Sequence, residues 1–210
     1  MASEKVDWQR KFDLSGGILS LDFANTVLKR NQSDRAEDEL SNYPRLAAFA
    51  KQTKLLSSAR ADALRSRAAK SPRSASAVLP AAVMLREAIY RVFSSVAAAN
   101  PVVSNDVKLI QDFALEAWKH RRLMPAAQGG YRWQWKAEEA EMPEQMLWPI
   151  ALSAAELLTS DRLRLVRQCA ADDCAWLFLD ESRNRSRRWC DMSVCGNRQK
   201  ARRHYLRALE

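Results

Sequence analysis

The residues best suited to chemistry are four cysteines, all of which lie in the last 42 residues of the chain. They form two close pairs with four residues inside each pair and fifteen between the pairs: Cys169, Cys174, Cys190 and Cys195. Four thiolates at about 2.3 Å complete the tetrahedral coordination of zinc, and two separated pairs let a short chain surround one ion. The spacing therefore predicts a structural zinc site that also helps this short segment to fold.

Disulfides, free thiols and a catalytic metal are the alternatives to a structural zinc site. The first 13 residues are too charged for a secretory signal, so we expect a cytoplasmic protein whose thiols stay reduced. A catalytic zinc keeps an open position, which four cysteines would close. His204 lies nine residues beyond Cys195 and is a competing ligand only in principle, because it better fits the surface of a final helix.

Positive charge is the second chemical signal, and it concentrates around the second cysteine pair. The formal net charge is +9, and nine basic residues against one acidic residue lie between Arg183 and Arg207. We expect a helix over 199–209 whose Tyr205, Leu206 and Leu209 face inward, with a ligand cysteine at its positive end. Arginine, asparagine and glutamine side chains would then lie on the outer face, and these are the side chains that bind phosphates and base edges. The predicted nucleic-acid contacts are Arg183, Arg185, Arg187, Arg188, Asn197, Arg198, Lys200, Arg202, Arg203 and Arg207. A solvated face that only balances the charge of the metal centre is the alternative, and charge alone does not separate DNA from RNA.

The elements that must position these residues are mostly helices. Apolar residues at steps of three and four predict helices over 19–27, 43–56, 78–99, 104–122 and 143–160, and 59–70 is rich in helix formers. The expected N-caps are Ser41 or Asn42 and Ser104 or Asn105. Residues 71–74 should end the helix over 59–70, and 31–39 should form a loop.

Strands are expected in three places. Alternating aromatic and polar residues predict a strand over 131–136 with one buried face, paired with 123–127 across Gly129 and Gly130. Short strands are also expected over 175–179 and 188–189. The fold class is therefore mainly α with small β hairpins (α+β): a helical N-terminal domain over 1–160 and a small treble-strand-and-helix zinc module over 163–210.

Polar residues within apolar helical segments suggest a ligand pocket in the N-terminal domain. Asp22, Asn25 and Arg86 are such residues, and Trp133 offers a flat surface to a small molecule. An ion-paired helix face and a core tryptophan are the alternatives. The sequence contains no glycine-rich phosphate loop, nucleophile elbow or HExxH motif, so we expect no enzyme activity. Carboxylate catalysis, for instance through Asp22 with Glu87, is the alternative.

Two motifs resemble a known pair of protein families. The CGNR sequence at 195–198 resembles the CGNR zinc finger, and LDFANTV at 21–27 resembles the opening of the ABATE domain, which usually precedes that finger. Together the two cover nearly the whole chain. The family is described as mostly bacterial, stress-induced transcription regulators, which implies four cysteine zinc ligands, DNA as partner and a sensory N-terminal domain. For Asn197 and Arg198 the resemblance leaves two roles open, DNA contact or support of the metal site, with Arg198 pairing to an acid such as Asp191.

The sequence therefore predicts a DNA-binding transcriptional regulator controlled by an unknown small-molecule effector in its N-terminal domain. The alternatives are a zinc-stabilised protein-interaction adaptor or a small-molecule-binding protein without DNA binding. A homodimer would compensate for the small surface that one finger buries on DNA. No run of about 18 apolar residues occurs, so no membrane segment is expected.

Overall fold

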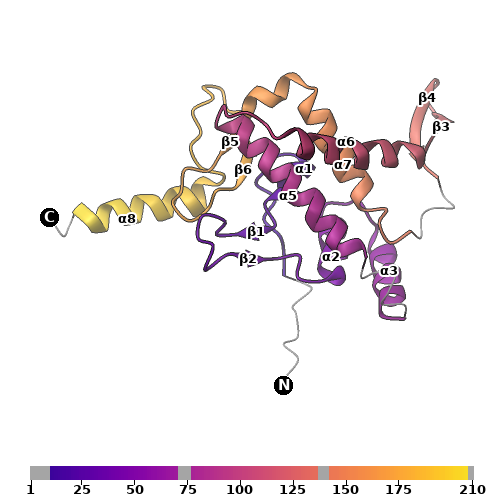
Figure 1. The fold of residues 1–210 in the computed structure, drawn as a ribbon, viewed down its shortest axis with the longest axis horizontal. Coiled ribbons are helices and arrows are strands. Elements are labelled where there is room, and N and C mark those ends of the chain that lie inside the picture. Colours follow the sequence, from indigo (N-terminus) through magenta and orange to yellow (C-terminus); the bar gives the residue numbers. More distant parts are fainter. Residues whose placement is uncertain (1–9, 71–76, 137–141, 208–210) are drawn as a thin grey trace.

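The structure, a computed structural model, describes residues 10–70, 77–136 and 142–207 (Figure 1). The helices of the N-terminal part are α1 (Leu19–Ala24), α2 (Tyr43–Gln52), α3 (Ser58–Lys70), α5 (Val78–Ala97), α6 (Ser104–Lys119) and α7 (Leu147–Leu158). A 3-10 turn over Asp161–Leu165 leads to the C-terminal part, where a π-type turn over Met192–Gly196 precedes α8 (Asn197–Arg207). Helices thus dominate, as the sequence predicts.

The strands form three separate antiparallel pairs. These pairs are β1 (Val27–Leu28) with β2 (Glu37–Asp38), β3 (Arg121–Pro125) with β4 (Tyr131–Trp135), and β5 (Val166–Gln168) with β6 (Leu177–Leu179). The predicted α+β class with small hairpins is confirmed. Two details are wrong: 31–39 contains β2 instead of being only a loop, and 188–189 forms no strand, because the partner of β6 is β5.

The core lies where α1, α5, α6 and α7 pack against one another. Its largest fully buried side chains include Phe23 on α1, with Leu85, Ile89 and Phe93 on α5. The short helix α1 is buried along nearly its whole length, which explains why its sequence is apolar on more than one face. None of the helices in the described ranges has the length and apolar character needed to cross a membrane.

Several helix boundaries follow local sequence signals. Asn42 caps α2 by accepting a hydrogen bond from the Arg45 amide at 3.0 Å, as predicted, with Pro44 in the first turn. The expected cap of α6 is wrong, because Val103 occupies that position without a side-chain hydrogen bond. Helix α7 begins at Leu147, since 143–146 form a turn. The predicted break at 71–74 lies outside the described residues.

The β3–β4 hairpin forms across Gly129 and Gly130 as predicted, but its first strand begins two residues earlier than expected, and it is not half-buried. Leu123 pairs with Trp133 across the hairpin, yet 54% of Leu123 and 45% of Trp133 are exposed. Figure 1 shows the hairpin beyond the end of α6, away from the helical core. Trp133 instead packs edge-on against Trp118 of α6, with a centroid distance of 5.0 Å. The alternating tryptophans of β4 thus pack against tryptophans of two helices, Trp133 against Trp118 of α6 and Trp135 against Trp148 of α7.

The C-terminal part packs into the same core as the helices. Val166, Leu177 and Leu179 of β5 and β6 are buried in one apolar cluster with the residues of α1 and α5. The Leu179 amide donates to the Gly16 carbonyl at 3.0 Å, and the Tyr90 hydroxyl donates to the Ala175 carbonyl at 3.2 Å. The strands that lead to the cysteines are therefore held by the N-terminal helices.

Candidate metal centre and nucleic-acid interface

The four cysteines converge on one buried point. Their sulfur atoms all lie within 4.8 Å of one another, and each cysteine is at most 6% exposed. The Sγ of Cys190 lies 3.7 Å from that of Cys174 and 3.6 Å from that of Cys195. A disulfide would need a sulfur separation of about 2.05 Å, and all four cysteines are free. A tetrahedron with ligands at about 2.3 Å has edges of about 3.8 Å. The cluster thus has the size of a tetrathiolate metal site.

Backbone hydrogen bonds place the first cysteine pair. The Cys169 amide donates to the Trp176 carbonyl at 2.8 Å, and the Cys174 amide donates to the Ala171 carbonyl at 3.1 Å. The chain thus turns back between Cys169 and Cys174 as it passes from β5 to β6. Trp176 also donates its indole Nε1 to the Val27 carbonyl at 2.8 Å, which joins this turn to β1.

The second pair depends on a capped turn. Asp191 accepts hydrogen bonds from the amides of Ser193, at 2.6 Å, and Val194, at 3.1 Å, directly after Cys190. These bonds hold the π-type turn that carries Cys195. A Cβ at Gly196, at the end of this turn, would come within 2.4 Å of the Met192 sulfur, so the flexible Met192 side chain would have to move. Local sequence chemistry therefore brings Cys195 back toward Cys190.

Electrostatics favours a cation at this point. Hydrogen bonding with the Cys169 sulfur is the largest cause that raises the pKa of the thiols of Cys174 and Cys190, whereas hydrogen bonds with the other three sulfurs lower the pKa of Cys169. Burial raises the pKa values of Cys174 and Cys190 further. Four buried thiolates so close together would repel one another, whereas a divalent metal ion compensates their charge. The donor set, its burial and its size consequently fit a metal ion.

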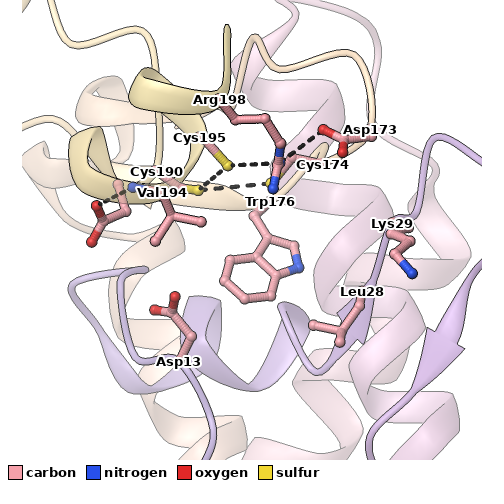
Figure 2. A pocket seen from close by; sticks show the side chains of 11 residues that line it. Asp13, Leu28, Lys29, Asp173, Cys174, Trp176, Cys190, Val194, Cys195 and Arg198 are labelled. Atoms are coloured by element: carbon pink, nitrogen blue, oxygen red, sulfur yellow. Dashed lines mark hydrogen bonds and ion pairs between the residues drawn. The ribbon is translucent and has the colours of Figure 1, made fainter. Parts of the chain in front are cut away.

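Arg198 and the acidic residues near it surround the cluster. Figure 2 shows the Arg198 guanidinium between the Cys195 sulfur, at 3.4 Å, and the Asp173 carboxylate, at 2.8 Å. Arg202 makes an ion pair with Asp172 in the same turn. The expected pair of Arg198 with Asp191 is wrong, because Asp191 caps the turn over 192–196 instead. Metal ligands are often held by such outer contacts, which orient the donor and adjust its charge.

Comparison with known families agrees with this geometry. The family described as "Putative stress-induced transcription regulator", ABATE, matches residues 17–161. The chain belongs to this family. The CGNR zinc finger matches residues 165–208 and so includes the whole cysteine cluster. No curated protein matches the chain. The resemblance stated from the two short motifs is thereby confirmed.

Helix α8 of the CGNR finger extends away from the body of the molecule (Figure 1). Residues three, four and seven apart share a helix face, so Lys200, His204 and Arg207 lie on one side and are exposed. Arg198 and Arg202 lie on another side, where they pair with Asp173 and Asp172. The expectation that Tyr205 and Leu206 face inward is wrong, since they are 65% and 51% exposed. His204 is not part of the cysteine cluster.

The predicted contact residues of the finger divide into two groups. Those with structural contacts are Arg187, Arg198, Arg202 and Asn197. The Asn197 side chain donates through Nδ2 to the Ser193 carbonyl at 3.1 Å. Those that are exposed and have no ion-pair partner among the described residues are Arg183, Arg185, Arg188, Lys200 and Arg207. The side chain of Arg203 lies outside what the structure describes. The second group could contact phosphates without breaking an internal ion pair.

A buried carboxylate organises the basic loop that precedes the second cysteine pair. Asp180 is fully buried, and its carboxylate accepts hydrogen bonds from the amides of Ser182, at 3.1 Å, and Arg187, at 2.9 Å. Burial raises the pKa of Asp180, but a hydrogen bond from the Ser182 hydroxyl, followed by those from the two amides, brings this pKa below its usual value. Arg187 in turn packs over the Phe178 ring and donates to the carbonyls of Trp189 and Cys190. Asp180 was not among the residues predicted from the sequence, although an acid that ends an apolar strand before a basic loop could have indicated it.

None of the four residues predicted to line an N-terminal ligand pocket lines the cavity beside the cysteines or the one where α3, β4 and α7 meet. Asp22 accepts the Gly16 amide at 2.8 Å, and Asn25 bonds to β6. Arg86 is buried and makes ion pairs with Asp38 and Glu87, while Trp133 lies on the exposed hairpin. The contacts given for Asp22, Asn25 and Arg86 are therefore structural, and Trp133 lies on a different element from these three.

A small cavity lies directly beside the cysteines. It has a volume of about 190 Å³, and its lining combines Cys174, Cys190 and Cys195 of the finger with Leu28 and Lys29 of the ABATE domain. Figure 2 shows Trp176 between these two groups of residues. The cysteine cluster is thus buried against the N-terminal domain as well as within its own turns.

Proposed function

We propose that this protein is a DNA-binding transcriptional regulator of the cytoplasm, in which one zinc ion fixes α8 as the DNA-contacting helix. Cys169, Cys174, Cys190 and Cys195 would hold the ion. Zinc bound by four thiolates has no open coordination position, so its chemistry would be structural. The proposal assigns the protein no enzymatic activity.

The observation that carries the proposal is the place of α8 relative to the cysteines. The helix begins two residues after Cys195, so the metal would fix its first turn directly. Its far end extends away from the protein (Figure 1), and Lys200 and Arg207 lie on one exposed face. A cationic helix that is held at one end and exposed along its length suits the major groove, which is about 12 Å wide.

The loop before the second cysteine pair would add contacts to phosphates. Arg183, Arg185 and Arg188 are exposed there, on a loop shaped by Asp180. A single small finger buries little surface on DNA, so a homodimer on two half-sites is part of the proposal. Phosphate contacts release counterions, which makes binding strongly dependent on salt.

The test is fluorescence anisotropy of labelled duplex DNA over a series of salt concentrations. Wild-type protein is compared with a Lys200→Ala, Arg207→Ala double variant. The matched control is Lys70→Ala with Lys54→Ala, because both lysines are exposed on the N-terminal helical part. The α8 variant should bind at least tenfold more weakly and lose about two units of salt slope, while the control binds like wild type.

Two results would contradict the proposal. The first is that wild-type protein with one zinc per chain shows no salt-dependent binding to any duplex DNA in a randomised pool. Equal losses in the two double variants would mean that net charge alone attracts DNA. Protein that has lost its zinc to a chelator should also lose binding, because α8 then loses its anchor.

A protein-interaction adaptor is the second candidate, favoured by the apolar surface of the finger. Its exposed apolar side chains are Met192, Val194, Tyr205 and Leu206, which are 46%, 49%, 65% and 51% exposed. Aromatic residues and methionine are enriched at protein interfaces. A finger that takes up zinc but leaves DNA unbound at low salt would favour this function over regulation.

A further inference from the structure

A second cavity lies at the end of the molecule opposite α8, where α3 and β4 are found (Figure 1). Its volume is about 310 Å³, which is within the range of small-molecule pockets. Its lining includes Leu55 and Arg60 near the start of α3, Trp135 and Lys136 of the hairpin, and Gln145 and Trp148 near the start of α7. Three separate segments of the ABATE domain therefore meet around it.

Two tryptophans give this cavity flat apolar walls. The rings of Trp135 and Trp148 are 5.6 Å apart between centroids and are tilted by 38°. Trp148 is 5% exposed, and its ring stacks on His120 at a centroid distance of 3.8 Å. Because His120 holds the Trp148 ring from one side, this wall of the cavity is already in place without a ligand.

Arg60 supplies a guanidinium that lacks part of its hydrogen bonding. Its Nε donates to the Gln145 side chain at 3.2 Å, which fixes the plane of the group. Its Nη2 is buried and has no hydrogen-bond partner among the described residues. A buried donor without an acceptor is costly, but Nη2 has less than 1 Å² of accessible surface, so an acceptor in the cavity would form a charge-assisted hydrogen bond with it only after a small shift of the Arg60 side chain.

The charge of the lining is of one sign. Arg60 and Lys136 are its ionisable residues, and no aspartate or glutamate lines the cavity in the described part of the chain. Gln134 and Gln145 add amide groups. Among the described lining residues a cation would meet no acidic side chain, whereas a carboxylate would meet the Arg60 guanidinium in a partly dehydrated setting.

We propose that this cavity binds a small organic anion with a flat apolar body. Its carboxylate would accept from Nη2 of Arg60, and its ring would lie against Trp135 and Trp148. In a regulator of the kind proposed above, such an anion would be the effector that the N-terminal domain binds. Only this regulatory role rests on the proposed function. Binding itself requires neither zinc chemistry nor DNA.

The experiment uses the full zinc-loaded chain, labelled with ¹⁵N, and follows the indole N–H signals of its tryptophans. The probe is 2-naphthoate, and 2-naphthamide has the same ring without the charge. Signals of Trp135 and Trp148 are identified from Trp→Phe variants. We expect 2-naphthoate to move these two signals in a saturable way and to bind at least tenfold more tightly than 2-naphthamide.

Arg60→Gln is the variant that tests the anion contact, and Arg65→Gln is its control one turn along α3. Arg65 pairs with Asp62 and does not line the cavity. Arg60→Gln should weaken 2-naphthoate at least tenfold, and Arg65→Gln less than twofold. Equal binding of acid and amide, no effect of Arg60→Gln in a folded protein, or no movement of either indole signal would each overturn the inference. DNA binding is measured separately, so that either proposal can fail alone.

Discussion

The side chain of Asn25 makes the two hydrogen bonds with Leu177 that the backbone of a neighbouring strand would make. Its Nδ2 donates to the Leu177 carbonyl and its Oδ1 accepts from the Leu177 amide, both at 2.8 Å and both buried. Asn25, which directly follows α1, thereby satisfies the backbone of Leu177 in β6, while the Leu179 amide of the same strand donates to Gly16. This contact explains an asparagine within the apolar LDFANTV segment, and it joins the ABATE domain to the CGNR finger.

Asn25→Asp should therefore weaken the junction between the domains. The change keeps the size of the side chain but replaces the donor with an oxygen that faces the Leu177 carbonyl. We expect a loss of about 2–4 kcal/mol in the free energy of unfolding, measured by chemical denaturation. The control is Asn31→Asp, at an exposed position. A loss that is equally small in the two variants would show that the paired bonds with Leu177 add little.

Removal of the metal should destabilise the helical domain together with the finger. Val166, Leu177 and Leu179 belong to the apolar cluster of α1 and α5, so melting of the finger exposes part of that cluster. Cys190→Ser should abolish stoichiometric zinc in native mass spectrometry and lower the Tm of the helical signal by at least about 5 °C. A helical domain whose Tm is the same with and without metal would contradict this coupling.

Asp22 should give the fold an unusual dependence on pH. Burial raises the pKa of its carboxyl from 3.8 to about 7, against the opposing hydrogen bond from Gly16, and the charge of Asp13 raises it further. Between these two values the folded chain binds the proton more tightly than the unfolded chain does. This group therefore stabilises the fold least above pH 7, where its charged form must be buried.

Asp22→Asn should remove that penalty while keeping an acceptor for the Gly16 amide. We expect the variant to be more stable than wild type at about pH 8.5, by on the order of a few kcal/mol. The difference should shrink toward about pH 6, as measured by denaturation at each pH. Asp34→Asn, at an exposed position, serves as control. A constant difference across this range would refute a titrating Asp22.

Two neighbouring basic residues of α8 should separate metal support from DNA contact. Arg198 contacts the Cys195 sulfur and Asp173, so Arg198→Ala should lower zinc affinity by about 10–100-fold. Lys200 points to another side of the helix, and Lys200→Ala should leave zinc affinity unchanged while weakening DNA binding. Zinc affinity is measured by competition with a chromophoric chelator. Unchanged zinc affinity in Arg198→Ala would assign that motif arginine to DNA.

The sequence by itself determined the elements whose signals are local. Cysteine spacing indicated the four-sulfur cluster, periodicity indicated α5 and α6, and Asn42 with Pro44 indicated the start of α2. These features depend on residues close in the chain, or on one metal that needs a fixed number of donors. The CGNR and LDFANTV motifs were likewise sufficient to identify the two families.

Only the tertiary structure decided which polar residues are free. Arg86 and Asn25 looked like ligand contacts in the sequence, but partners 48 and 152 residues away bind them. Arg198 and Arg202 looked like DNA contacts, but Asp173 and Asp172 pair with them. Charge and polarity are visible in a sequence, whereas the partner that neutralises them is fixed by contacts between distant segments. Arg60 shows the converse: among the described residues its Nη2 has no acceptor, and this becomes visible only once three distant segments are brought together around the cavity.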